Sequence, residues 1–87
     1  MHEIHYRTFP VKKTIGAIQK ECDKEAVEYG DYHHKLEPIR FKDRVCKDED
    51  EARNWIEQND SGWYDQLAIK FKDGRKIMWL VKYEYHV

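Results

Sequence analysis

The spacing of apolar residues changes several times along this chain, and those changes constrain the fold more than any other feature. From Glu3 to Phe9 apolar and polar residues alternate, which is the period of a strand, and Pro10 ends it. From Lys12 to Tyr29 apolar residues recur every three or four positions, which predicts a helix with one buried face. Gly30 is expected to close that helix in the left-handed conformation. The chain therefore begins with a strand and a helix.

The rest of the chain predicts one more helix and three more strands. Residues Ile39–Cys46 alternate again, and an acidic form of the capping box at Asp48–Glu51 begins a helix that runs to about Asn59. Two further alternating segments, Leu67–Lys72 and Lys76–Val87, flank a glycine-containing turn that is typical of a hairpin. The predicted order is β-α-β-α-β-β.

The register of this hairpin follows from which residues are apolar, because residues directly opposite one another in an antiparallel pair share a face. A three-residue loop at Lys72–Gly74, with the glycine in the left-handed conformation, sets Phe71 opposite Arg75 and Ile69 opposite Ile77. A two-residue turn at Asp73-Gly74 would mix apolar and charged side chains on each face. We therefore expect the three-residue loop.

These elements predict one α+β domain over residues 1–87, folded as a two-layer α/β sandwich. A chain of 87 residues leaves no room for a second domain. Two right-handed βαβ crossovers that keep one direction along the sheet place both helices on the same side. We therefore expect a mixed four-stranded sheet with two helices on one face and the other face open.

The charge of that open face suggests a first candidate surface. Alternation places seven cations there: Arg7, Arg40, Lys42, Arg44, Lys70, Lys72 and Lys82. A bare basic sheet favours an anionic partner, and phosphate backbones attract such faces. The simpler interpretation is that exposed strand positions favour Lys and Arg. The net charge of −1, the pI near 6.5 and the lack of stacking aromatic rings on this face speak against strong nucleic-acid binding.

A second candidate surface combines acidic residues with large aromatic rings. It consists of Asp48, Glu49, Asp50, Trp63 and Tyr64. Acidic side chains beside Trp and Tyr are typical of a hot spot for a basic protein partner. The alternative is that the two aromatic rings fold over the edge of the core.

No group of residues marks an enzyme, a metal site or a cofactor site. His33 and His34 lack a cysteine pair with the short spacing of structural zinc sites, and Cys22 falls on the buried stripe of its helix. Cys46 precedes a helix N-terminus, but no histidine is placed near it to activate a thiolate. We expect a chain without catalytic residues, metal or cofactor.

The sequence also predicts where the chain resides. Its longest apolar run, Met78–Val81, is too short to span a membrane, and the N-terminal residues lack the pattern of a secretory signal. Two cysteines are too few for a disulfide framework, so we expect reduced thiols and a cytoplasmic location.

Together these features predict a small non-catalytic domain that binds a macromolecular partner, with protein favoured over nucleic acid. The slightly negative net charge and the acidic-aromatic segment carry that preference. The small size and high charge would suit an accessory or inhibitor protein of a phage or plasmid. The alternative is a nucleic-acid-binding domain that uses the basic sheet, and unpaired strand edges allow either a monomer or a homodimer.

Overall fold

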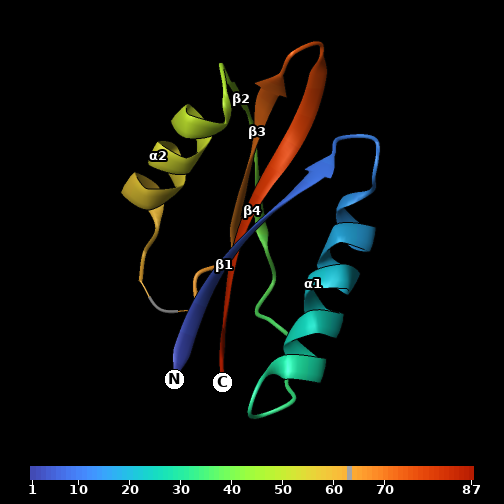
Figure 1. Ribbon diagram of the computed structural model, residues 1–87, viewed down its shortest axis with the longest axis vertical. Helices are drawn as coiled ribbons and strands as arrows, with labels where there is room; N and C mark the ends of the chain where they lie inside the picture. The colour runs from blue at the N-terminus through green and yellow to red at the C-terminus, as the bar shows by residue number, and fades with distance from the viewer. Residues whose placement is uncertain (63) are drawn as a thin grey trace.

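The chain folds into a mixed four-stranded sheet with one helix on each side (Figure 1). The computed structural model describes residues 1–62 and 64–87. The elements are β1 (His2–Pro10), α1 (Ile15–Tyr29), β2 (Arg40–Cys46), α2 (Glu49–Asn59), β3 (Leu67–Asp73) and β4 (Lys76–His86). The predicted α+β class, the mixed sheet and the β-α-β-α-β-β order are confirmed. Among the described residues, no helix is long and apolar enough to cross a bilayer.

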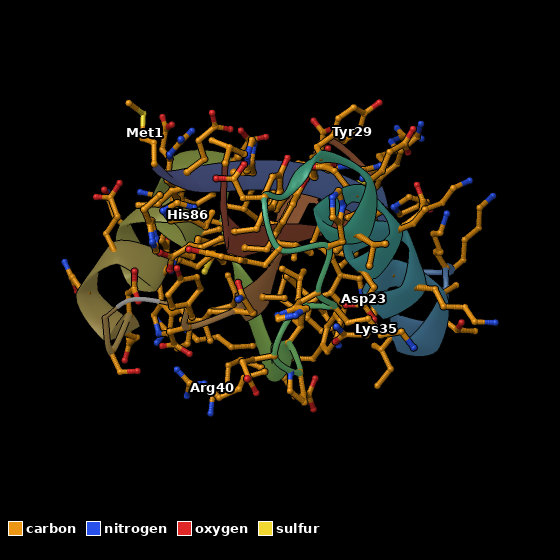
Figure 2. The ribbon with its side chains drawn as sticks, turned by 90° about the horizontal axis from the view of Figure 1, so that it is seen from below. Met1, Asp23, Tyr29, Lys35, Arg40 and His86 are labelled. Carbon is orange, nitrogen blue, oxygen red and sulfur yellow. The ribbon has the colours of Figure 1, made fainter. Side chains whose placement is uncertain are left out.

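The strands lie side by side in the order β1-β4-β3-β2. The last strand, β4, is central and antiparallel to both of its neighbours, and β2 pairs in parallel with β3. The sheet therefore ends in β1 on one side and β2 on the other. Seen along the sheet, β1 follows one margin of the molecule and Arg40 of β2 lies at the opposite margin (Figure 2).

The two helices pack against opposite faces of the sheet, so the prediction of both helices on one face is wrong. Ala68 belongs to the core cluster that contains the buried residues of α1. Its neighbours Leu67 and Ile69 belong to the cluster that contains the buried residues of α2. Since successive side chains of a strand point to opposite faces, the sheet lies between the helices. We name its two sides the α1 face and the α2 face.

The strand order explains this arrangement. The connection from β1 to β2 crosses β4 and β3 to the far edge, and the connection from β2 to β3 returns toward the centre. Right-handed crossovers that run in opposite directions along a sheet place their helices on opposite faces. The prediction assumed that both crossovers run in one direction, and nothing local in the sequence reports that direction.

The hairpin between β3 and β4 is tighter than expected. Asp73 pairs with Lys76, so only Gly74 and Arg75 form the loop, and the three-residue loop is wrong. Gly74 has the predicted positive φ, of 61°. Glycine at the first of two central positions is what a type II′ turn requires.

The hairpin is present as predicted, but its predicted register is wrong because the central part of β4 has no solvent-exposed face. Ile69 lies opposite Leu80, whereas the prediction set it opposite Ile77. Every residue from Trp79 to Tyr85 is buried. Odd and even residues of β4 are both covered in this stretch. Matching the apolar face of β3 to an apolar face of β4 therefore did not define the register of the hairpin.

Side chains define the helix starts, and a close approach of the backbone defines the end of α1. The Thr14 hydroxyl accepts a hydrogen bond from the backbone N–H of Ala17 at 3.1 Å, and Asp48 caps α2 as predicted. Gly30 has a φ of −75°, so its predicted left-handed conformation is wrong. A Cβ there would lie 2.5 Å from the carbonyl oxygen of Ala26, so the position requires glycine for space.

Candidate interaction site

The seven predicted cations do not share one face. The register places Arg7, Lys70 and Lys72 on the α1 face and Arg40, Lys42 and Lys82 on the α2 face, and Arg44 lies in the irregular stretch of β2. The predicted single basic face is therefore wrong, because it depended on both helices lying on the other side of the sheet.

Four of these seven cations also form ion pairs within the chain. Arg7 binds Glu21 and Glu25, Arg40 binds Asp65, Lys70 binds Asp43, and Lys82 binds Asp60 and Glu84. Each carboxylate offsets the positive potential that a phosphate would meet at that position. The arrangement does not concentrate positive charge on one surface.

Lys82 lies at the centre of a buried polar network on the α2 face. Its side chain is 1% exposed, and its Nζ donates to the backbone carbonyl oxygen of Asp65 at 2.7 Å. The same ammonium pairs with Asp60 at 2.9 Å and with Glu84. Glu84 also contacts the ring of His2. A buried charge needs such partners, so this lysine has a structural role.

Asp65 connects that network to β2. Arg40 donates to both carboxylate oxygens of Asp65, at 3.1 and 2.7 Å, and the backbone N–H of Ser61 donates at 2.8 Å. Burial alone would raise the pKa of Asp65, but the hydrogen bonds from Arg40 and Ser61 outweigh burial and lower that pKa to about 2. The carboxylate thus holds the loop before β3 against the start of β2.

A different polar cluster joins α1 to the α1 face. Glu25 accepts hydrogen bonds from the hydroxyls of Tyr83 at 2.8 Å and Tyr85 at 3.0 Å, and from the Arg7 guanidinium at 3.2 Å. Burial is the larger cause and the Glu25 carboxylate the second, and together they raise the pKa of Tyr85 to about 12. The same two causes raise the pKa of Tyr83. No local pattern in the sequence predicts this docking, because strand order alone brings Arg7 beneath the helix.

The predicted acidic-aromatic surface is divided by the length of α2. Asp48, Glu49 and Asp50 lie at the start of this 11-residue helix, and Tyr64 lies beyond its end, so about 16 Å of helix separates them. Tyr64 is exposed, with a φ of 62° and its ring centroid 4.9 Å from that of His2. Trp63 lies outside the described residues. The three acidic residues and Tyr64 do not form one contiguous patch.

The thiols are buried, which raises their pKa. Burial raises the pKa of Cys22 to about 12 and also raises the pKa of Cys46. Both are therefore thiols near neutral pH, which makes them poor nucleophiles. Within residues 1–62 and 64–87, no cluster of three His, Cys, Asp or Glu side chains has the geometry to hold a metal.

A cavity and a groove open on the part of the surface that the structure describes. A cavity of about 280 Å³ lies beside the loop after α1, and its wall includes Tyr32, His33, His34, Gln66, Glu84 and His86. In that wall the Gln66 side chain donates to the backbone carbonyls of Tyr64 and Glu84 and accepts from the Glu84 N–H, and the Glu84 carboxylate accepts from Lys82. A shallow groove follows the end of β1, and it is lined by Pro10, Val11, Lys12, Lys76, Ile77 and Met78.

The outer edge of β1 is regular along its whole length. All nine residues of β1 pair in an unbroken register with β4. Beyond its ends, the N–H of Val11 donates to the Ile77 carbonyl at 3.2 Å and the N–H of Val87 to the Met1 carbonyl at 2.6 Å. Hydrogen-bonded pairs alternate in an antiparallel ladder, so the odd residues of β1 bond to β4 and the even ones direct their N–H and C=O groups outward, except that Pro10 has only the C=O group.

Exposed apolar side chains accompany this backbone edge. On the α2 face, α2 packs over β3, β2 and β4, and of the β1 side chains on that face it leaves Ile4 and Thr8 exposed. Ile4 is 56% exposed there, Thr8 is exposed, and the half-buried Tyr6 ring lies under the Arg53 guanidinium at 4.0 Å. We name the outward backbone groups and side chains of Ile4, Tyr6 and Thr8 the β1 edge. It is the candidate interaction site.

Sequence reasoning identified β1 as a strand but not as the exposed edge, because edge position depends on strand order. No family model, curated protein sequence or solved structure matches the chain. The geometry of the β1 edge is therefore the basis for assigning a function.

Proposed function

We propose that this chain is a non-catalytic domain that binds a protein partner by pairing an extended segment of that partner with the β1 edge. The supporting observation is the unbroken nine-residue register of β1, which leaves a regular row of outward N–H and C=O groups. An extended peptide satisfies such a row by adding a strand to the sheet.

Backbone pairing supplies affinity in this mode, and alternate side chains supply specificity. On the α2 face, a partner strand would place its side chains beside Ile4 and Thr8, where apolar contact removes the exposed isoleucine from water. A partner with β-branched or aromatic residues at alternate positions therefore fits best.

A peptide backbone fits the β1 edge better than a nucleic acid does. The cations that favoured nucleic acid lie on two faces, and Arg7, Arg40, Lys70 and Lys82 are paired with carboxylates.

The test is a proline in the edge strand. Ile4→Pro removes an outward N–H and leaves the hydrogen bonds to β4 intact, because Ile4 is an even residue. Tagged protein purified from its native host would identify partners, and binding of each would then be measured by calorimetry. We expect Ile4→Pro to weaken binding at least about tenfold, the loss of one or more main-chain hydrogen bonds.

Ile4→Thr is the matched control, since it shortens the same side chain but keeps the N–H and a β-branched residue. It should bind within a few-fold of the unmodified chain. Circular dichroism and thermal unfolding would show that both variants fold. Equal binding by the unmodified chain and Ile4→Pro would contradict the proposal.

A further inference from the structure

We infer that the partner which the β1 edge fits best is a second copy of this chain, paired antiparallel about a two-fold axis at His5. The inference rests on the proposed function, because it uses the same edge. It adds the identity of the partner and a specific register.

The pairing rule leaves few registers to consider. Directly opposite residues of an antiparallel pair share a face, so odd residues must meet odd and even must meet even. With the axis at His5, Glu3 faces Arg7 of the second copy and Ile4 faces Tyr6 of the second copy. Each contact occurs twice by symmetry, which gives two opposite-charge pairs and two apolar pairs.

Neighbouring registers lose the charge match. Moving the axis to Tyr6 sets Glu3 opposite Phe9, and moving it to Ile4 sets Arg7 opposite an apolar side chain. Neither shift pairs both charged residues of the strand with an opposite charge. Charge complementarity therefore selects the register centred on His5.

The backbone supports the same register. Ile4 and Tyr6 direct their N–H and C=O groups outward, so these residues become hydrogen-bonded pairs across the axis. Glu3, His5 and Arg7 then occupy the non-hydrogen-bonded positions, where Cα atoms are only about 4.5 Å apart and side chains lie closest.

The charged side chains remain accessible in the single chain. The Arg7 side chain is 36% exposed while bound to Glu21 and Glu25, and that of Glu3 is 45% exposed. A guanidinium carries five N–H donors, so Arg7 keeps capacity for a further carboxylate. On the α2 face, α2 packs over β3, β2 and β4, and its Arg53 side chain lies over the Tyr6 ring, while Ile4 stays exposed.

The dimer should be concentration-dependent. One added strand pair buries less than the roughly 1,200 Å² of a typical stable interface. Sedimentation across a range of concentrations is therefore the first measurement, and we expect a reversible monomer–dimer equilibrium. Ile4→Pro should shift it at least about tenfold toward monomer, and Ile4→Thr should shift it far less.

A cysteine at the axis tests the register. His5 is the one strand position that faces itself, and a Cα separation of about 4.5 Å suits a disulfide. Under mild oxidation, His5→Cys should cross-link at least about tenfold faster than Glu3→Cys, which faces an arginine. Cys22 and Cys46 are buried and serve as the common background. If His5→Cys fails to fold, a mixture of Ile4→Cys and Tyr6→Cys should cross-link to each other.

Charge exchange gives an independent test. Glu3→Arg alone and Arg7→Glu alone each set like charges opposite one another twice, so each should dimerise more weakly. A mixture of the two variants restores both opposite-charge pairs and should form a heterodimer that is stronger than either homodimer. Circular dichroism would show that each variant is folded before mixing.

The outcomes separate the two proposals. A chain that stays monomeric at its highest soluble concentration overturns the self-pairing, while the proposed function stands if Ile4→Pro still weakens binding of another protein at least about tenfold. Equal cross-linking of His5→Cys and Glu3→Cys overturns the register. A dimer that Ile4→Pro leaves unchanged overturns the β1 edge as the site of self-pairing.

Discussion

Two polar clusters lie on opposite faces of β4, and they differ in their exposure to water. On the α2 face, the Lys82 and Glu84 side chains are 1% and 2% exposed. On the α1 face, Glu25 is 21% exposed and accepts three hydrogen bonds, from Arg7, Tyr83 and Tyr85. Successive residues of one strand thus occupy two environments. We therefore expect burial, more than the number of contacts, to decide how much each polar group contributes to the free energy of unfolding.

The buried cluster must satisfy every charge internally. The ammonium of Lys82 has three protons, and it has three acceptors: the Asp65 carbonyl, Asp60 and Glu84. An ammonium that left water without such partners would be strongly unfavourable. In the partly exposed cluster, water replaces a lost partner, so each contact contributes less.

Removal of Lys82 should have the largest effect. Lys82→Met leaves the buried Glu84 carboxylate without its cation, and breaking a buried pair costs about 3–5 kcal/mol. That is a large part of the roughly 5–15 kcal/mol that stabilises a domain. Urea unfolding would measure the loss.

The double variant Lys82→Met with Glu84→Met is the control. Replacing both members of a buried pair with apolar residues is often neutral, so it should recover more than half of the lost stability. A Lys82→Met chain whose free energy of unfolding lies within about 1 kcal/mol of that of the unmodified chain would contradict this expectation, because burial would then not decide the effect.

The second-largest effect should come from acid, which protonates the Asp65 carboxylate on the α2 face. Asp65 has a folded pKa of about 2, below its ordinary value of 3.8, so its contribution is present above about pH 4 and is lost as the pH falls toward 2. After allowance for solvent screening, we expect no more than about 2 kcal/mol. Urea midpoints measured between about pH 5 and pH 2 would show the loss, and Asp65→Asn should flatten this dependence. An unchanged slope in that variant would assign the acid sensitivity to other carboxylates.

A smaller effect is expected on the α1 face. Tyr85→Phe removes one hydrogen bond to the partly exposed Glu25, which costs about 1 kcal/mol. The raised pKa of Tyr85, about 12, means that its contribution is present below pH 10 and is lost as the pH rises from 10 toward 12. Ultraviolet titration should show one high-pH tyrosine transition that is missing in Tyr85→Phe. If Tyr85→Phe lowered the free energy of unfolding as much as Lys82→Met does, the two clusters would contribute equally to stability despite their different exposure.

Much of the fold could be predicted from local sequence patterns, because apolar spacing reports each element directly. The predicted strand Ile39–Cys46 begins one residue before β2, and the cap at Asp48 is confirmed. What local patterns could not report is which strands are neighbours. That order depends on long-range pairing, and it decides which face each residue occupies.

The error at Lys82 shows how this limit affects the site. Alternation with Val81 and Tyr83 suggested an exposed lysine, yet β4 is central and covered on both faces. Apolar residues occur at both odd and even positions of β4, for example Trp79 and Leu80, and this pattern indicates a strand that is buried on both faces. The β1 edge was missed for the same reason, since an edge strand and a central strand can share one alternating pattern.

The smallest effect is expected for an ion pair that lies in water. The Asp43 carboxylate is 2.9 Å from the Lys70 ammonium, but the Asp43 side chain is 96% exposed. The hydrogen bond from Lys70 lowers the pKa of Asp43. Surface pairs of this kind contribute little because water and salt screen them. Asp43→Asn should therefore leave the urea midpoint unchanged within error, at low and at high salt. If Asp43→Asn shifts the midpoint as far as Tyr85→Phe, exposure is not what separates strong from weak polar contacts in this sheet, and the geometry of each contact must be the cause.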